Sequence, residues 1–268
     1  MNAPIGVIDS GVGGLTVAKQ IMKLLPEETI YYIGDTARCP YGPRSRKEVR
    51  EFTWQMAEAL RDMGVKMLVI ACNTATAVAL HSLQKHMPFP VLGVINAGAR
   101  AAIKKTKSHE IVVLATEGTV KSGAYEEAIL SLSTSSHILP LACPTFVPLV
   151  ESGEYRSEFA QKLIAEGLEP LNEERFDTVI LGCTHFPIIE KYIAEFFNGE
   201  KHIIDAGFET VTIALVQLHK KKLLTADNNT PHHRIFIHGE NNTFEKVMNS
   251  WIPDIEYSIE NILLQETY

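Results

Sequence analysis

The stretch IGVIDSGVGG, residues 5–14, has the pattern of a buried strand joined to a helix through a polar turn. Its apolar run, residues 5–8, ends directly at Asp9-Ser10-Gly11, and Thr16–Leu25 then carries apolar residues at helical spacing. A strand that feeds a helix through a short turn is the repeating unit of a parallel sheet. The stretch therefore predicts an α/β protein.

The same alternation continues along the chain. The pattern predicts strands at 29–33, 67–71, 90–94, 110–115, 137–142, 178–181, 201–204, 234–238 and 255–258. It predicts helices at 16–25, 47–63, 73–84, 124–130, 158–168, 210–222 and 244–251, with a loop at 225–233. The expected fold class is α/β, with two similar lobes of mainly parallel sheet flanked by helices.

An internal repeat supports the two lobes. In each half a strand ends in a small polar turn, Asp9-Ser10-Gly11 in the first and Thr116-Glu117-Gly118 in the second. Later in each half a strand ends in a cysteine followed by polar residues, Cys72-Asn73-Thr74 and Cys183-Thr184-His185. Open α/β sheets bind ligands at the carboxyl ends of their strands. We therefore expect two lobes facing each other across a cleft, with one cysteine from each.

Composition excludes several classes of protein. The chain has 268 residues, 46% hydrophobic and 21% charged, with a net charge of −7, which is ordinary for a globular protein and argues against a nucleic-acid partner. The sequence has neither a signal peptide pattern nor an apolar run long enough for a membrane helix, so no membrane partner is expected. Four cysteines without a CxxC pair favour reduced thiols in the cytoplasm and argue against a structural zinc site.

The paired cysteines are the strongest chemical signal. Each is expected to open a helix, whose N-terminus lowers a thiol pKa; the alternative is that each is a small buried hydrophobic residue. Two thiols on opposite sides of a small ligand suit stereoinversion, in which one removes an α-proton and the other returns a proton to the opposite face. Cys39 lies in a proline-rich loop and receives no chemical role, and Cys143 is interpreted as structural.

Asp9 and His185 are the expected auxiliary residues for proton transfer or for holding a substrate ammonium group. The alternatives are an Asx turn for Asp9 and a structural role at a helix start for His185. The glycine turn lacks both the GxGxxG and the P-loop patterns, so it is interpreted as a carboxylate-binding turn. Neutral donors around that carboxylate are expected from Ser10, Asn73, Thr74, Thr116, Thr119 and Thr184.

The motifs together resemble the glutamate racemase family of the aspartate/glutamate racemase superfamily, over essentially the whole chain. They are Ile8-Asp9-Ser10-Gly11-Val12-Gly13-Gly14-Leu15, Pro40-Tyr41-Gly42, Ala71-Cys72-Asn73-Thr74-Ala75 and Leu181-Gly182-Cys183-Thr184-His185-Phe186-Pro187. The resemblance implies interconversion of L- and D-glutamate without cofactor or metal, supplying D-glutamate for peptidoglycan.

The resemblance also implies residue roles. Cys72 and Cys183 are the acid/base pair, with Cys183 acting on L-glutamate and Cys72 on D-glutamate. Asp9, Ser10, Pro40, Tyr41, Gly42, Asn73, Thr74, Thr184 and His185 form the substrate shell. It further implies a first lobe of residues 1–95 and 206–268, a second lobe of residues 96–205, and a homodimer.

Alternative functions stay open from the residues alone. A sister racemase acting on aspartate would carry the same thiols, and a two-lobed binding module could close on an amino acid without chemistry. A metal site at Cys183 and His185 is disfavoured because no further ligand cluster lies near them in the sequence. A pyridoxal enzyme is disfavoured because no motif marks a Schiff-base lysine with a phosphate cup.

Overall fold

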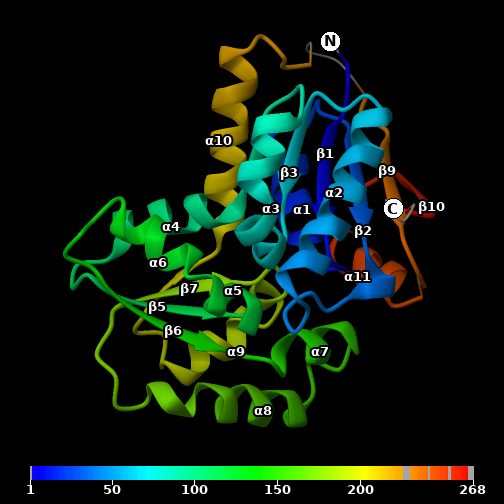
Figure 1. The fold of residues 1–268 in the computed structure, drawn as a ribbon. Coiled ribbons are helices and arrows are strands. Elements are labelled where there is room, and N and C mark those ends of the chain that lie inside the picture. The colour runs from blue at the N-terminus through cyan, green and yellow to red at the C-terminus, as the bar shows by residue number, and fades with distance from the viewer. Residues whose placement is uncertain (1, 226–229, 241, 253–254, 265–268) are drawn as a thin grey trace.

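The structure is a computed structural model that describes residues 2–225, 230–240, 242–252 and 255–264. It contains a six-stranded sheet in the order β10-β9-β2-β1-β3-β4 and a four-stranded sheet in the order β6-β5-β7-β8 (Figure 1). The strands are β1 Ile5–Asp9, β2 Ile30–Gly34, β3 Met67–Ile70, β4 Val91–Gly93, β5 Glu110–Ala115, β6 His137–Ala142, β7 Thr178–Gly182, β8 His202–Ile204, β9 His233–Ile237 and β10 Tyr257–Asn261. All paired strands run parallel, which confirms the predicted α/β class.

Helices cover both faces of both sheets (Figure 1). They are α1 Leu15–Leu24, α2 Arg46–Asp62, α3 Asn73–His86, α4 Val94–Lys105, α5 Glu117–Ser122, α6 Ala124–Leu130, α7 Phe146–Glu151, α8 Glu158–Leu168, α9 Glu190–Phe196, α10 Ala206–Lys220 and α11 Asn242–Trp251. One core of the six-stranded sheet packs against α1, α10 and α11, and the other packs against α2 and α3. The four-stranded sheet is covered by α7, α8 and α9 on one face and by α4 and α6 on the other.

Several predicted boundaries are wrong. Helices α4, α5, α7 and α9 were not predicted, and Val94, predicted to end a strand, is instead the first residue of α4. The predicted helix 210–222 begins earlier, at Ala206, because the Asp205 carboxylate caps it by accepting from the Gly207 N–H at 2.9 Å. The late strand predicted at 255–258 is shifted to β10, and part of the predicted loop 225–233, residues 226–229, lies outside the described residues.

The topology gathers polar residues at the carboxyl ends of neighbouring strands. In the first sheet β1 pairs with β2 and β3, so Asp9 at the end of β1 lies beside the end of β3, just before Cys72. In the second sheet Ala115 of β5 pairs with Gly182 of β7, which brings together the residues that follow them. The fold thereby places the two predicted cysteines after corresponding strands of different sheets.

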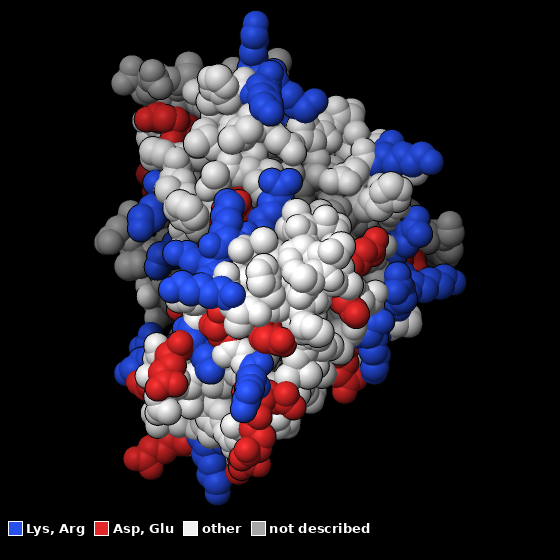
Figure 2. All heavy atoms as spheres, turned by 90° about the vertical axis from the view of Figure 1, so that its left-hand side faces the viewer, with Lys and Arg blue, Asp and Glu red and all other residues white. Residues whose placement is uncertain are grey.

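The surface carries mixed charge. Figure 2 shows the face that lies to the left in Figure 1, where lysine and arginine side chains alternate with aspartate and glutamate around a neutral area. Within the described residues, no helix is long and apolar enough to cross a membrane.

Candidate active site

Cys72 lies at the start of α3, where its Sγ accepts a hydrogen bond from the Ala75 N–H at 3.4 Å. Its side chain is buried, and burial raises the pKa of the thiol to about 12, with the nearby Asp9 charge acting in the same direction. Hydrogen bonds from Ala75 and Ser10 oppose that rise without cancelling it. The predicted lowering of the pKa by the helix start is therefore present, through the Ala75 N–H, but burial outweighs it and the pKa of the thiol is raised overall.

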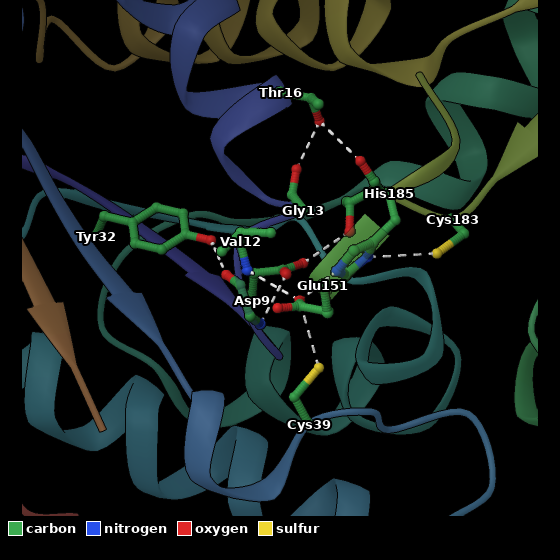
Figure 3. Close-up of polar contacts among 11 residues, drawn as sticks. Asp9, Val12, Gly13, Thr16, Tyr32, Cys39, Glu151, Cys183 and His185 are labelled. Carbon is green, nitrogen blue, oxygen red and sulfur yellow. Dashed lines mark hydrogen bonds and ion pairs between the residues drawn. The ribbon is translucent and has the colours of Figure 1, made fainter. Parts of the chain in front are cut away.

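Cys183 directly follows β7 and is buried to a similar extent. The prediction that Cys183 opens an α-helix is wrong, because the element that follows it is a single 3₁₀ turn, Phe186–Ile188. Its polar partner is instead a side chain: the Cys183 Sγ lies 3.7 Å from the His185 Nδ1 (Figure 3). The electrostatic environment of this thiol is therefore set by an imidazole rather than by a helix N-terminus.

His185 forms a buried pair with Glu151, whose Oε1 lies 2.6 Å from the His185 Nε2. Burial by itself lowers the pKa of His185, but the hydrogen bonds with Cys183 and Glu151 and their negative charge raise it well above its usual range. For Glu151, burial is likewise outweighed by His185, so the pKa of this carboxyl is lowered. The pair is therefore a charged imidazolium–carboxylate pair, with the other imidazole nitrogen facing Cys183.

Glu151 is the site residue that sequence reasoning missed. It ends α7, a helix of six residues, and meets a histidine 34 positions later in the chain. Its Oε1 also accepts from the Val12 N–H at 3.3 Å and from the Cys39 Sγ at 3.6 Å (Figure 3). A helix this short has no apolar periodicity of its own, so no local pattern marked the carboxylate.

Asp9 is completely buried and links the two sheets. Its Oδ2 accepts from the Gly11 N–H at 3.0 Å, and its Oδ1 accepts from the Thr184 hydroxyl at 3.1 Å. Burial raises its pKa to about 6, although His185 and these hydrogen bonds act against the rise. The Asx-turn contact considered from the sequence is present, and the contact with Thr184 adds a role between the sheets.

Three threonine hydroxyl groups meet where the start of α3 lies against the start of α5. Thr74 Oγ1 lies 2.8 Å from Thr116 Oγ1 and 3.1 Å from Thr119 Oγ1, and the latter two are 3.1 Å apart. The backbone of Gly42 packs against Thr116 so tightly that a Cβ there would lie 2.8 Å from the threonine. The contacts place Thr74, Thr116, Thr119 and Gly42 together, and their part in binding a substrate carboxylate stays a prediction.

The remaining predicted residues lie around the same centre with different partners. The Asn73 Oδ1 accepts from the Tyr125 hydroxyl at 2.8 Å, which leaves its amide group as a donor. The buried Tyr41 donates its hydroxyl to Asp35, so it offers its ring rather than a free hydroxyl. Ser10 is buried beside Cys72, and Pro40 follows Cys39 through a cis peptide bond in the same loop as Tyr41.

One set of side chains among the described residues has the composition of a metal site. It consists of Cys39, Glu151 and His185, whose ligand atoms all lie within 4.8 Å of one another. This differs from the alternative considered from the sequence, which paired His185 with Cys183.

Comparison with known proteins places the chain among racemases. The profile of the family described as Asp/Glu/Hydantoin racemase matches residues 5–214. A glutamate racemase of Lysinibacillus sphaericus (strain C3-41) is 66% identical over 265 residues, which cover 99% of this chain and 100% of the relative. A glutamate racemase isoform from Bacillus anthracis superposes with a TM-score of 0.93 at 44% identity, over 98% of both chains. The Francisella tularensis glutamate racemase, solved in complex with D-glutamate, gives a TM-score of 0.92 at 32% identity, over 99% of both chains.

Proposed function

The chain belongs to the Asp/Glu/hydantoin racemase family, and we propose that it interconverts L- and D-glutamate by proton transfer between its two buried cysteines. The full-length identity to glutamate racemases supports glutamate as the substrate. The family's role is to supply D-glutamate for peptidoglycan, and this chain has the same role. The observation that carries the mechanism is the position of Cys72 and Cys183 at strand ends of different sheets.

In the direction from L- to D-glutamate, the Cys183 thiolate removes the α-proton from one face of the substrate. The electron pair of the broken C–H bond stays on the α-carbon and spreads into the adjacent carboxylate. Cys72 then gives its thiol proton to the opposite face, which inverts the centre and leaves Cys72 as the thiolate. The raised pKa of Cys72 suits this step, because the group must carry a proton before turnover.

His185 and Glu151 support the Cys183 side of the reaction. The charged imidazole places its Nδ1 3.7 Å from the sulfur, where a positive charge stabilises the thiolate. Glu151 fixes the other nitrogen at 2.6 Å and thereby sets the orientation and charge of the ring. Glu151 acts through His185, so its role is positioning.

Asp9 supports the Cys72 side. In the reverse direction Cys72 must lose its proton, although the Asp9 charge disfavours a second negative charge nearby. The ammonium group of bound glutamate compensates that charge and so lowers the pKa of Cys72. The substrate thus supplies the positive charge that lets the buried Cys72 thiol, whose pKa is raised by burial, lose its proton and act as a base.

The neutral donors hold the substrate. The hydroxyls of Thr74, Thr116 and Thr119 and the amide of Asn73 bind carboxylate oxygens without placing a fixed cation beside the thiols. Ser10, Tyr41, Gly42 and Thr184 line the same centre. Because Cys72 and Cys183 are only 5% and 6% exposed, glutamate enters when the loops of the two sheets separate.

The proposal extends to assembly and location. Helix α10, at the left in Figure 1, exposes Phe208 and Leu215, which are 58% and 39% exposed and two helical turns apart. Exposed apolar side chains of this size suit a contact between two copies of the chain, and we assign them to the homodimer. All four cysteines are free thiols, in keeping with the reducing cytoplasm.

The test follows D-glutamate formation from L-glutamate by purified, chelator-treated protein without pyridoxal phosphate. The proposal predicts racemisation of glutamate with a kcat/KM well above that for aspartate. A preference for aspartate would identify a sister racemase. Binding of glutamate with no change of enantiomer would identify a binding module and refute the proposed racemase activity.

A further inference from the structure

Three metal-binding side chains of different chemistry converge beside the catalytic centre. Cys39 belongs to the loop between β2 and α2, Glu151 ends α7, and His185 follows β7 (Figure 3). Their ligand atoms lie within 4.8 Å of one another. The loop of Cys39 extends from the six-stranded sheet, whereas His185 extends from the four-stranded sheet, so the cluster bridges the two.

The Glu151 Oε1 is the common point of this cluster. It accepts from the Cys39 Sγ at 3.6 Å and pairs with the His185 Nε2 at 2.6 Å. In a tetrahedral zinc site the bonds measure about 2.0–2.3 Å, which separates neighbouring ligand atoms by about 3.3–3.6 Å. The sulfur–oxygen distance already lies at that separation, and the nitrogen–oxygen pair needs to open by less than about 1 Å.

The donor set discriminates between metal ions. A thiol, an imidazole and a single carboxylate oxygen suit Zn²⁺, whereas Mg²⁺ and Ca²⁺ require several oxygen ligands. His185 is buried, but Cys39 is partly exposed and the Glu151 side chain is 24% exposed, so an ion reaches the cluster from solvent. Three protein ligands leave a fourth position for water.

We propose that Cys39, Glu151 and His185 form an inhibitory Zn²⁺ site. Zinc takes the place of the Cys39 thiol proton and the His185 Nε2 proton that now face the Glu151 carboxylate, and both protons leave to solvent. The bound ion holds the Cys39 loop against residues of the other sheet and occupies the Glu151–His185 pair. Inhibition, although not zinc binding, rests on the proposed racemase function, in which that pair supports Cys183 and the sheets must separate to admit substrate.

Calorimetric titration of the chelator-treated full chain with ZnCl₂, in the absence of glutamate, tests the site directly. A single zinc ion is expected per chain, with no binding of MgCl₂. Cys39→Ser removes the thiolate ligand and is expected to weaken zinc binding at least about 10-fold. Cys143→Ser removes a thiol that is buried in the core of the four-stranded sheet and donates to the Leu141 carbonyl at 3.8 Å, and this variant is expected to bind zinc as the unaltered chain does.

A Cys72→Ser variant distinguishes this site from one between the two catalytic thiols. It keeps its zinc affinity under the proposal, and it loses that affinity if zinc bridges Cys72 and Cys183. Cobalt substitution gives a second readout: the thiolate-to-cobalt absorption band must vanish in Cys39→Ser. Unchanged zinc affinity in Cys39→Ser, or loss of affinity in Cys72→Ser, overturns the proposal.

Racemisation assays connect the site to activity. Zinc is expected to inhibit the unaltered chain reversibly, with recovery on adding chelator, and to inhibit Cys39→Ser at least about 10-fold less strongly. Cys39 has no part in the proposed proton path, so Cys39→Ser keeps its activity without zinc. A chain that binds zinc through Cys39 but does not racemise glutamate would refute the proposed function and leave the metal site standing. Racemisation without zinc, together with zinc binding that does not depend on Cys39, would refute the metal site and leave the proposed function standing.

Discussion

Glu151→Gln is expected to slow racemisation about 10- to 100-fold without unfolding the chain. The substitution keeps the size of the side chain and removes the negative charge that lies 2.6 Å from the His185 Nε2. A hydrogen bond to a charged group contributes about 1.5–3 kcal/mol, and about 1.4 kcal/mol corresponds to a tenfold rate change. The expected loss follows if that energy stabilises the imidazolium when Cys183 carries its negative charge.

The pH profile separates this role from a merely structural one. Glu151 raises the pKa of His185, so the imidazolium persists to higher pH in the unaltered chain than in Glu151→Gln. The alkaline limb of kcat must therefore move to lower pH in the variant. Polarimetry or circular dichroism on L- and D-glutamate across pH gives kcat and KM in both directions, and thermal unfolding monitors the fold.

Glu154→Gln is the matched control, because it makes the same chemical change at an exposed residue three positions away. It is expected to keep the unaltered rate and pH profile. An unchanged kcat and an unchanged alkaline limb in Glu151→Gln would show that the Glu151–His185 pair does not act on Cys183.

Three further substitutions test the surroundings of the site. Asp9→Asn is expected to abolish most activity yet raise the free energy of unfolding at pH 8 by up to about 3 kcal/mol. The reason is that folding raises the pKa of Asp9 from 3.8 to about 6. The stability that its proton contributes is therefore complete below pH 3.8 and lost as the pH rises through 6. Urea unfolding at pH 4 and pH 8 checks the sign, and a variant destabilised more at pH 8 than at pH 4 would contradict it. Tyr125→Phe removes the hydroxyl that donates to the Asn73 Oδ1 at 2.8 Å and is expected to raise the KM for glutamate about 2- to 10-fold. An unchanged KM would show that this hydrogen bond does not contribute to substrate binding. Lys66→Met leaves the buried Glu28 carboxylate, 2.5 Å from the Lys66 Nζ, without its ion-pair partner. It is expected to lower the free energy of unfolding in urea by about 3–5 kcal/mol, and adding Glu28→Gln is expected to restore most of that loss. No recovery in the double variant would exclude the ion pair as the cause.

The arrangement of strand ends was predictable from the sequence because it depends on local patterns. Apolar runs that end in polar residues predicted Asp9, Cys72, Thr116 and Cys183 at the carboxyl ends of parallel strands, and the sheets place them there. The alternation of strands and helices likewise predicted the α/β class. These signals act over a few residues, where periodicity and turn chemistry are strong.

The contacts between distant segments were not predictable in this way. Glu151 meets His185 only because the short α7 packs beside the turn after β7, and neither segment encodes the other. The sequence does contain a signal against the predicted α-helix after Cys183, because Pro187 lies in the following turn, where proline suits the start of a 3₁₀ helix. The pKa of Cys72 depends on total burial, which a helix-start argument from sequence does not measure.

The two-cysteine mechanism is tested most directly by the origin of the α-hydrogen in the product. L-glutamate is incubated in deuterated buffer with the unaltered chain, Cys72→Ser and Cys183→Ser, and early D-glutamate is isolated and analysed by mass spectrometry and proton NMR. D-glutamate is expected to carry solvent deuterium from its first appearance, and each serine variant is expected to lose racemisation. D-glutamate that keeps the substrate's own α-proton, or a serine variant that racemises at the unaltered rate, would contradict proton transfer between opposed thiols.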